Sequence, residues 1–114
     1  MRTPLTRIVR ATITFAALFA FGFANISAAS PDAGAALYKT KCAACHGADG
    51  KGATAVGKAD SIRDLGSADV QGQSDAALTT IIASGKGKMP PYGKSLKPEQ
   101  ITALVAYVRS LASK

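Results

Sequence analysis

Two cysteines and the single histidine of this chain of 114 residues stand close together, in the run Cys42-Ala43-Ala44-Cys45-His46. On a helix that turns about 100° per residue, Cys45 lies about 60° from Cys42, and His46 lies about 40° from it. All three side chains therefore project from one face. Two thiols on that face can bond to the two vinyl groups of one porphyrin while the imidazole binds its iron. The spacing C-x-x-C-H is the pattern of c-type haem attachment.

Three other roles are open to these cysteines. They could form a structural disulfide, since their number is even and the chain carries an export pattern. They could form a thioredoxin-like redox pair, although no βαβ pattern surrounds them. They could belong to a zinc site, but the sequence has no further Cys or His to complete a tetrahedron. Haem attachment is favoured because it also explains the adjacent histidine and the scarcity of core residues.

A second iron ligand is expected from the other end of the chain. His46 is the only His, so two histidines of one chain cannot bind one iron, and Met89 is the only Met besides Met1. Met89 lies among the glycines, lysines and prolines of residues 85–93, which read as a loop. Pro90 biases Met89 toward extended backbone and stiffens the segment. A core methionine filling a gap is the alternative. We expect His46 and Met89 to be the metal ligands.

The first 29 residues have the pattern of a secretory signal peptide. Three basic residues, Arg2, Arg7 and Arg10, precede an apolar stretch over residues 11–24. The small residues Ser27-Ala28-Ala29 then offer a cleavage site after Ala29. The alternative is an uncleaved membrane anchor, but an apolar run of about 14 residues is shorter than the roughly 20 that a spanning helix needs. The sequence thus predicts a cleaved leader, 1–29, and one domain, 30–114, in the periplasm.

Composition limits what that domain can be. Without the leader it has 11 Lys and Arg against 7 Asp and Glu, a net charge of +4, which is modest for a nucleic-acid binder. It has no Trp, and its only aromatic residues are Tyr38, Tyr92 and Tyr107. A domain this small with so little apolar bulk usually needs a disulfide, a metal or a cofactor to be stable. A large enzyme, a multi-pass membrane protein and a disordered tail are excluded.

The rest of the chain reads as helices joined by glycine-rich loops, with no strand pattern. We expect helices from Asp32 to about Cys45, over 60–65, from an N-cap at Ser74 to Gly85, and from Pro98 onward. The last helix carries an apolar stripe of period 3.6: Ile101, Leu104, Val105, Val108 and Leu111. Gly34 lies inside the first helix, where glycine costs about 1 kcal/mol relative to alanine. That cost suggests that another backbone passes close to Gly34.

Taken together, these features resemble the class I cytochromes c of the small bacterial type. The markers are Gly34 and Tyr38 ahead of the 42–46 motif, then Met89-Pro90, then residues 104–111. The resemblance implies an all-α fold of three to five helices wrapped around one covalently bound haem c, with the first and last helices crossing so that Gly34 meets the Tyr107 region.

Two features depart from the family pattern. No proline lies between His46 and Met89, so the hydrogen-bond acceptor for the ligating imidazole is unassigned. No Trp is present to contact a haem propionate, and Arg63 or a lysine is the candidate replacement.

The expected function is that of a soluble periplasmic electron carrier rather than an enzyme, because two axial ligands leave no iron position for a substrate. Its partners would be a redox donor and acceptor with acidic docking surfaces, since four lysines surround Met89: Lys86, Lys88, Lys94 and Lys97. An ordinary solvated lysine-rich loop is the alternative. Membrane contact would come only through a redox complex or an uncleaved leader. Two other functions stay open: a redox module tethered to a larger oxidase or dehydrogenase, and a ligand-binding or peroxidase-like haem with a labile Met89.

Overall fold

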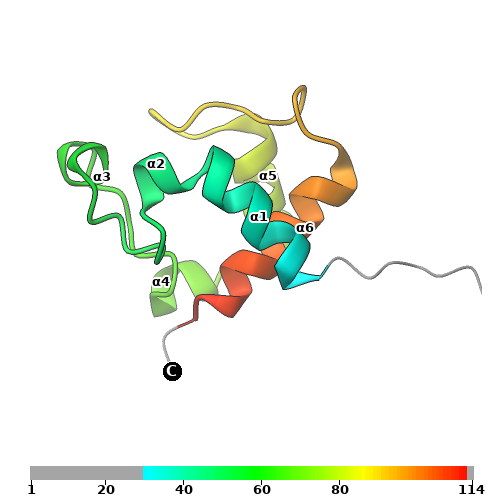
Figure 1. The fold of residues 1–114 in the computed structure, drawn as a ribbon, viewed down its shortest axis with the longest axis horizontal. Helices are drawn as coiled ribbons and strands as arrows, with labels where there is room; N and C mark the ends of the chain where they lie inside the picture. The colour runs from blue at the N-terminus through cyan, green and yellow to red at the C-terminus, as the bar shows by residue number, and fades with distance from the viewer. Residues whose placement is uncertain (1–29, 113–114) are drawn as a thin grey trace, which may run out of the picture.

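The computed structural model describes residues 30–112, so the expected leader over 1–29 lies outside the described residues. Six helical segments follow one another, and this part of the chain contains no strand (Figure 1). They are α1 (Pro31–Lys41), α2 (Ala43–His46), α3 (Ala55–Ala59), α4 (Ala68–Gln71), α5 (Asp75–Ser84) and α6 (Pro98–Ser110). The expected all-α class is confirmed, with one helical segment more than the upper limit of five.

The additional segments have local causes. Cys42 has a φ of −117° and divides the first expected helix into α1 and α2. The short helices α3 and α4, which the sequence did not predict, are N-capped by Thr54 and Ser67. The hydroxyls of these residues accept from Gly57 N at 2.8 Å and from Val70 N at 3.4 Å. Such N-caps satisfy amide groups that a helix start leaves unpaired.

The helix expected over 60–65 is wrong. Beyond its first residue, the amides of this segment do not bond four residues back, as in an α-helix: Ile62 N donates to Gly57 O of α3 at 2.8 Å, and Leu65 N donates across the loop to Gly50 O at 2.9 Å. Ser61 has a φ of +51°, which no α-helix contains. The segment is therefore a non-helical connection between α3 and α4.

The two longer later helices begin where the sequence predicted. Ser74 caps α5 by accepting from Ala77 N at 3.1 Å, and Pro98 opens α6. At the first helix the cap is Ser30, which accepts from Ala33 N at 3.3 Å, while Asp32 places its charge in the first turn. A carboxylate there is favourable because the helix amino end carries partial positive charge.

Helices α1 and α6 cross and make the main core contact (Figure 1). A Cβ on Gly34 would lie 2.0 Å from the carbonyl oxygen of Ala103 and 2.8 Å from Tyr107 Cβ, so only glycine fits there. The rings of Tyr38 and Tyr107 lie 4.8 Å apart beside this crossing. The expected contact of Gly34 with the Tyr107 region is confirmed.

The apolar stripe of α6 also lies where it was expected. Leu111 at its end is partly exposed. The other four residues of the stripe are buried: Ile101, Leu104, Val105 and Val108. Leu104 is the most enclosed, with 1% of its surface exposed. Together with Tyr38 and Leu78 they form a thin core on one side of the molecule. None of the helices between residues 30 and 112 has the length and apolar character that a membrane span requires.

Candidate functional site

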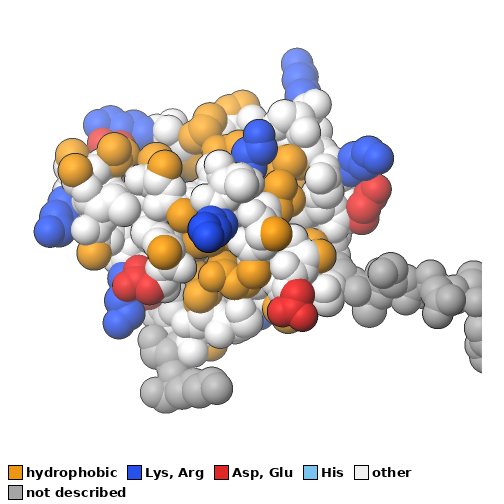
Figure 2. Space-filling view, viewed as in Figure 1, with side chains coloured by type: hydrophobic (Ala, Val, Ile, Leu, Met, Phe, Trp, Pro, Cys, Tyr) orange, Lys and Arg blue, Asp and Glu red, His pale blue; other side chains and the backbone are white. Residues whose placement is uncertain are grey.

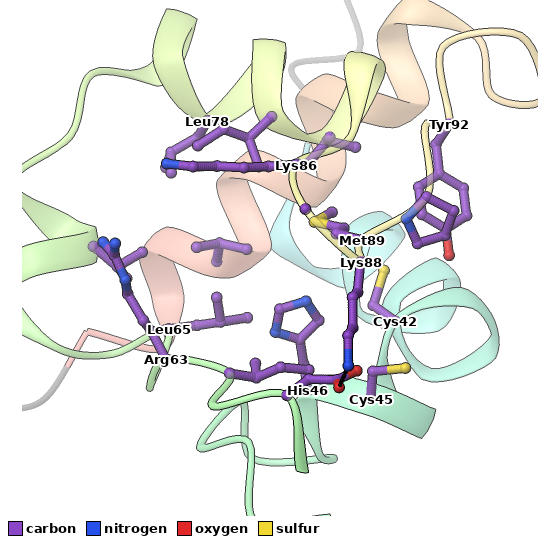
Figure 3. Close-up of a pocket in the computed structure, with 18 of the residues that line it drawn as sticks. Cys42, Cys45, His46, Arg63, Leu65, Leu78, Lys86, Lys88, Met89 and Tyr92 are labelled. Carbon is purple, nitrogen blue, oxygen red and sulfur yellow. Dashed lines mark hydrogen bonds and ion pairs between the residues drawn. The ribbon is translucent and has the colours of Figure 1, made fainter. Parts of the chain in front are cut away.

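A cavity of about 580 Å³ opens beside this core, and the four residues singled out in the sequence all line it: Cys42, Cys45, His46 and Met89 (Figure 3). Residues far apart in the chain are thereby brought to one space. The rest of the wall is mainly apolar and includes Leu65, Val70, Leu78, Ile82, Leu104 and Val108. The core is thin because several of its buried residues, including Leu104 and Val108, face this cavity and not other side chains.

The backbone of the 42–46 motif is fixed from two directions. Along the chain, His46 N donates to Cys42 O at 3.0 Å, which closes the turn of α2. Across the loop, the Thr54 hydroxyl donates to Cys45 O at 2.7 Å, and Gly52 N donates to His46 O at 2.6 Å. The two thiols and the imidazole therefore project from a rigid turn into one cavity, as the spacing predicted.

The His46 imidazole lies inside the wall of the cavity. Its Nδ1 is the one buried side-chain nitrogen or oxygen without a hydrogen-bond partner within residues 30–112. Burial lowers the pKa of His46, which favours the neutral imidazole that can bind a metal. A buried unpaired nitrogen costs about 1–3 kcal/mol. The described residues thus give Nδ1 no acceptor in place of the missing proline, and the neutral ring can bind a metal through its other nitrogen.

Both cysteines are free thiols in this structure. Burial raises the pKa of Cys42 to about 11, and the neighbouring Cys45 thiol adds to the shift. The Cys42 thiol is therefore protonated at neutral pH. Tyr92 stands next to this pair, and its pKa is also raised, first by burial and then by the two thiols.

Met89 is carried by a tight turn, in the loop the sequence predicted. Lys86 N donates to Met89 O at 3.2 Å and Met89 N donates to Lys86 O at 3.0 Å. Gly85 has a φ of +73°, and a Cβ there would lie 2.5 Å from Met89 O, so the turn requires glycine. Figure 3 shows the Met89 side chain on the opposite side of the cavity from the His46 ring.

The base of this loop is anchored to two helices. Tyr92 N donates to Ile82 O of α5 at 3.0 Å, and the Tyr92 hydroxyl donates to Lys41 O of α1 at 3.1 Å. Sequence reasoning placed Tyr92 in the loop and gave it no role. A tyrosine directly after two prolines could have indicated this role, because its ring can pack on one element while its hydroxyl bonds to another.

Charged side chains occupy the rim. Arg63 and Lys86 lie on one side of the His46 ring and the thiols of Cys42 and Cys45 on the other (Figure 3). Arg63 pairs with Asp69 at 2.8 Å, and Lys88 pairs with Asp60 at 2.6 Å. Sequence reasoning missed Asp60, which no local pattern marks because it meets the Lys88 side chain only in the folded chain.

The arrangement matches what one haem requires of a protein. An imidazole and a thioether sulfur on opposite walls are a known axial pair for haem iron. The two thiols lie at one edge of the space between those walls, where vinyl groups can reach them. An apolar lining and cations at the far rim suit a flat ring that is apolar except for two carboxylates.

Comparison with known proteins agrees with this geometry. The family model described as cytochrome c oxidase, cbb3-type, subunit III matches residues 29–108. The chain is 36% identical over 102 residues to cytochrome c6 of Gloeothece citriformis, covering 86% of this chain and 89% of that protein. It is 43% identical over 72 residues to the cbb3-type cytochrome c oxidase subunit CcoP of Rubrivivax gelatinosus, covering 62% of this chain but only 23% of that subunit.

A solved structure supports the same assignment. The KustC0563 c-type cytochrome superposes with a TM-score of 0.66 at 34% sequence identity, covering 70% of this chain and 98% of that one. Fold and relatives thus agree, and membership of this family implies haem c with its iron. The chain belongs to the cytochrome c family.

Proposed function

We propose that this domain is a soluble periplasmic electron carrier that holds one haem c through Cys42, Cys45, His46 and Met89. The observation that carries the proposal is the convergence of these four side chains on one largely apolar cavity. The export pattern of residues 1–29 supports the periplasm, because haem c is attached outside the cytoplasm of bacteria that make such leaders.

Each residue has a defined task. The thiols of Cys42 and Cys45 would each add to one vinyl group and hold the haem by two thioether bonds. His46 and Met89 would be the two protein ligands of its iron. When bound, the haem supplies a one-electron Fe(II)/Fe(III) couple. With both residues bound to it, the iron would offer no position to a substrate.

The far rim of the cavity supports one orientation of the ring. Vinyl groups and propionates occupy different edges of a haem, so a ring bonded to Cys42 and Cys45 directs its propionates away from α2. Arg63 and Lys86 line the cavity on that other side (Figure 3). These two cations would neutralise the propionates in place of the absent tryptophan.

Mass spectrometry of protein made with haem-attachment machinery tests the attachment. One covalent haem per chain is expected, and replacing either cysteine with serine should leave a haem held by a single bond. A matched control is Ser61→Ala, which changes another residue lining the cavity but no thiol. Haem that washes out of the unaltered protein under denaturing conditions would contradict the proposal.

Docking on acidic partners is the proposed basis of partner choice. The four lysines near Met89 are all exposed: Lys86, Lys88, Lys94 and Lys97. The face seen in Figure 2 carries Lys and Arg side chains at several separate places, with hydrophobic surface between them. One acidic side chain, Asp60, does lie among these lysines in space. The cations would speed association with an acidic surface at low salt.

Stopped-flow electron transfer to an acidic redox protein tests this docking surface. Changing Lys86 and Lys94 to Glu should slow the bimolecular rate at low salt and flatten its salt dependence. Changing Lys51 and Lys58 to Glu is the control, because it makes the same change of charge on lysines outside the group of four near Met89. Equal losses in both pairs would mean that only net charge matters.

A second candidate is a redox module within a larger oxidase, favoured by the match to cbb3-type oxidase subunits. Co-purification separates the two. A carrier is recovered alone from a periplasmic extract, whereas a module is recovered from membranes together with oxidase subunits.

A further inference from the structure

The tip of the Met89 loop is tied to the opposite wall of the cavity at a single point. Within the turn, Lys86 and Met89 bond to each other. Among the hydrogen bonds and ion pairs of residues 30–112, only the one between Lys88 Nζ and Asp60 Oδ1, at 2.6 Å, joins residues 86–91 to that wall. In Figure 3 the Lys88 side chain runs from the Met89 loop past the His46 ring, and the short dashed line at its end marks this ion pair.

Asp60 belongs to the same rigid unit as His46. It follows the last residue of α3, where Asp60 N donates to Val56 O at 2.9 Å. The N-cap of that helix, Thr54, donates its hydroxyl to Cys45 O at 2.7 Å. A Cβ on Gly57 of α3 would lie 2.9 Å from the same carbonyl, so α3 packs directly on the motif turn. The ion pair therefore joins the side of the cavity that carries His46 to the loop that carries Met89.

We infer that Asp60 and Lys88 are positioning residues, which form a strap that holds the Met89 loop in place over the haem. This inference rests on the proposed function, because it takes Met89 as the iron ligand. For Met89 to leave the iron, the loop tip must move and the Lys88–Asp60 contact must break. The strap thus lowers the population of the open loop in which a small molecule reaches the iron.

The exposure of the pair sets the size of the effect. The Lys88 side chain is 77% exposed and the Asp60 side chain 18% exposed, so water and salt partly screen the interaction. An ion pair of this kind changes an opening equilibrium by about threefold. At about 1 M salt, where the Debye length is about 3 Å, most of that effect should disappear.

Imidazole binding to the oxidised, haem-loaded protein, followed by its visible spectrum, measures loop opening. Asp60→Asn and Lys88→Gln should each raise the apparent affinity about threefold at low salt, and the two together should raise it no further than either alone. Lys88 lies on the surface, so Lys88→Gln keeps the test valid even if Asp60→Asn disturbs the fold. Asp75→Asn is the matched control, since it removes a carboxylate from an exposed ion pair with Arg109, away from the cavity.

A charge swap separates positioning from a merely structural role. Asp60→Lys combined with Lys88→Asp should restore weak imidazole binding, because the same attraction is rebuilt in reverse. Single variants that bind imidazole like the wild type, or that keep their full gain at high salt, would overturn the strap. If the wild type already binds imidazole as tightly as Met89→Ala, the proposed ligation fails and the strap fails with it. If the wild type resists imidazole and the variants resist it equally, only the strap fails.

Discussion

Replacing Gly34 with alanine should change the free energy of unfolding in two opposite ways, through helix propensity and through packing. By propensity alone, alanine inside α1 should stabilise the helix by about 1 kcal/mol. The new Cβ, however, would lie 2.0 Å from Ala103 O, whereas a carbon and a carbonyl oxygen pack no closer than about 3.3 Å. Helices α1 and α6 would have to separate by more than about 1 Å at their crossing.

That separation is costly because the most deeply buried residues of the core lie at the crossing. Leu104 is 1% exposed there, and the Tyr38 and Tyr107 rings lie 4.8 Å apart beside it. Overpacking of this kind costs about 3 kcal/mol. After the gain in propensity, we expect Gly34→Ala to lower the free energy of unfolding by about 2 kcal/mol.

Urea denaturation of the haem-loaded protein, followed by circular dichroism, measures this change, and the melting temperature should fall by about 10 °C. Gly72→Ala is the control. Gly72 has a φ of −74°, and a Cβ there would lie 3.1 Å from Ala68 O, which is too close by only about 0.2 Å. A small shift relieves that contact, so the change should stay within about 0.5 kcal/mol. A Gly34→Ala protein as stable as the wild type would refute the argument from the helix crossing.

Three further substitutions test the roles of particular side chains. Tyr38 donates its hydroxyl to Gly47 O at 2.7 Å, so Tyr38→Phe should cost about 1–2 kcal/mol in urea denaturation. Burial also raises the pKa of Tyr38, so the Tyr38 hydroxyl ionises near pH 10 in the unfolded chain but stays protonated there in the folded one. The free energy of unfolding should therefore fall as pH rises above about 10, and Tyr38→Phe should make that fall less steep. Arg109 donates to Asp75, Gln71 O and Gln73 O, a fork that lysine cannot reproduce, so Arg109→Lys should lose about 1–2 kcal/mol in the same assay, and an unchanged midpoint would contradict it. Arg63→Gln should lower the haem reduction potential by roughly 20 mV in redox titration, because a cation near the propionates favours the reduced form; an unchanged potential would place the propionates elsewhere.

The parts of the fold that could be predicted were those set by local chemistry. Ser74 and Pro98 mark helix starts because a capping hydroxyl and a fixed φ act within one turn. The C-x-x-C-H spacing places three side chains on one face whatever surrounds it. Gly34 could be interpreted because a glycine inside a helix needs a reason, and a close backbone is the common one.

The parts that failed depend on contacts between distant segments. Residues 60–65 have no local breaker until Gly66, but Leu65 N bonds to Gly50 O across the loop, and Ser61 takes a left-handed φ just after the end of α3. The Asp60–Lys88 pair joins positions 28 residues apart and leaves no mark in either neighbourhood. The sequence around Met89 predicted a loop, but not that Tyr92 anchors its base to α1 and α5.

Met89 is expected to complete the iron coordination begun by His46, and carbon monoxide tests this ligation most directly. The measurement is the visible spectrum of the reduced, haem-loaded protein before and after carbon monoxide is added, with Met89→Ala as the open-site reference. If Met89 holds the sixth position, the wild-type spectrum is low-spin and unchanged by the gas, while that of the variant shifts. A wild-type spectrum that shifts as the variant's does would contradict the account and would favour a haem that binds ligands.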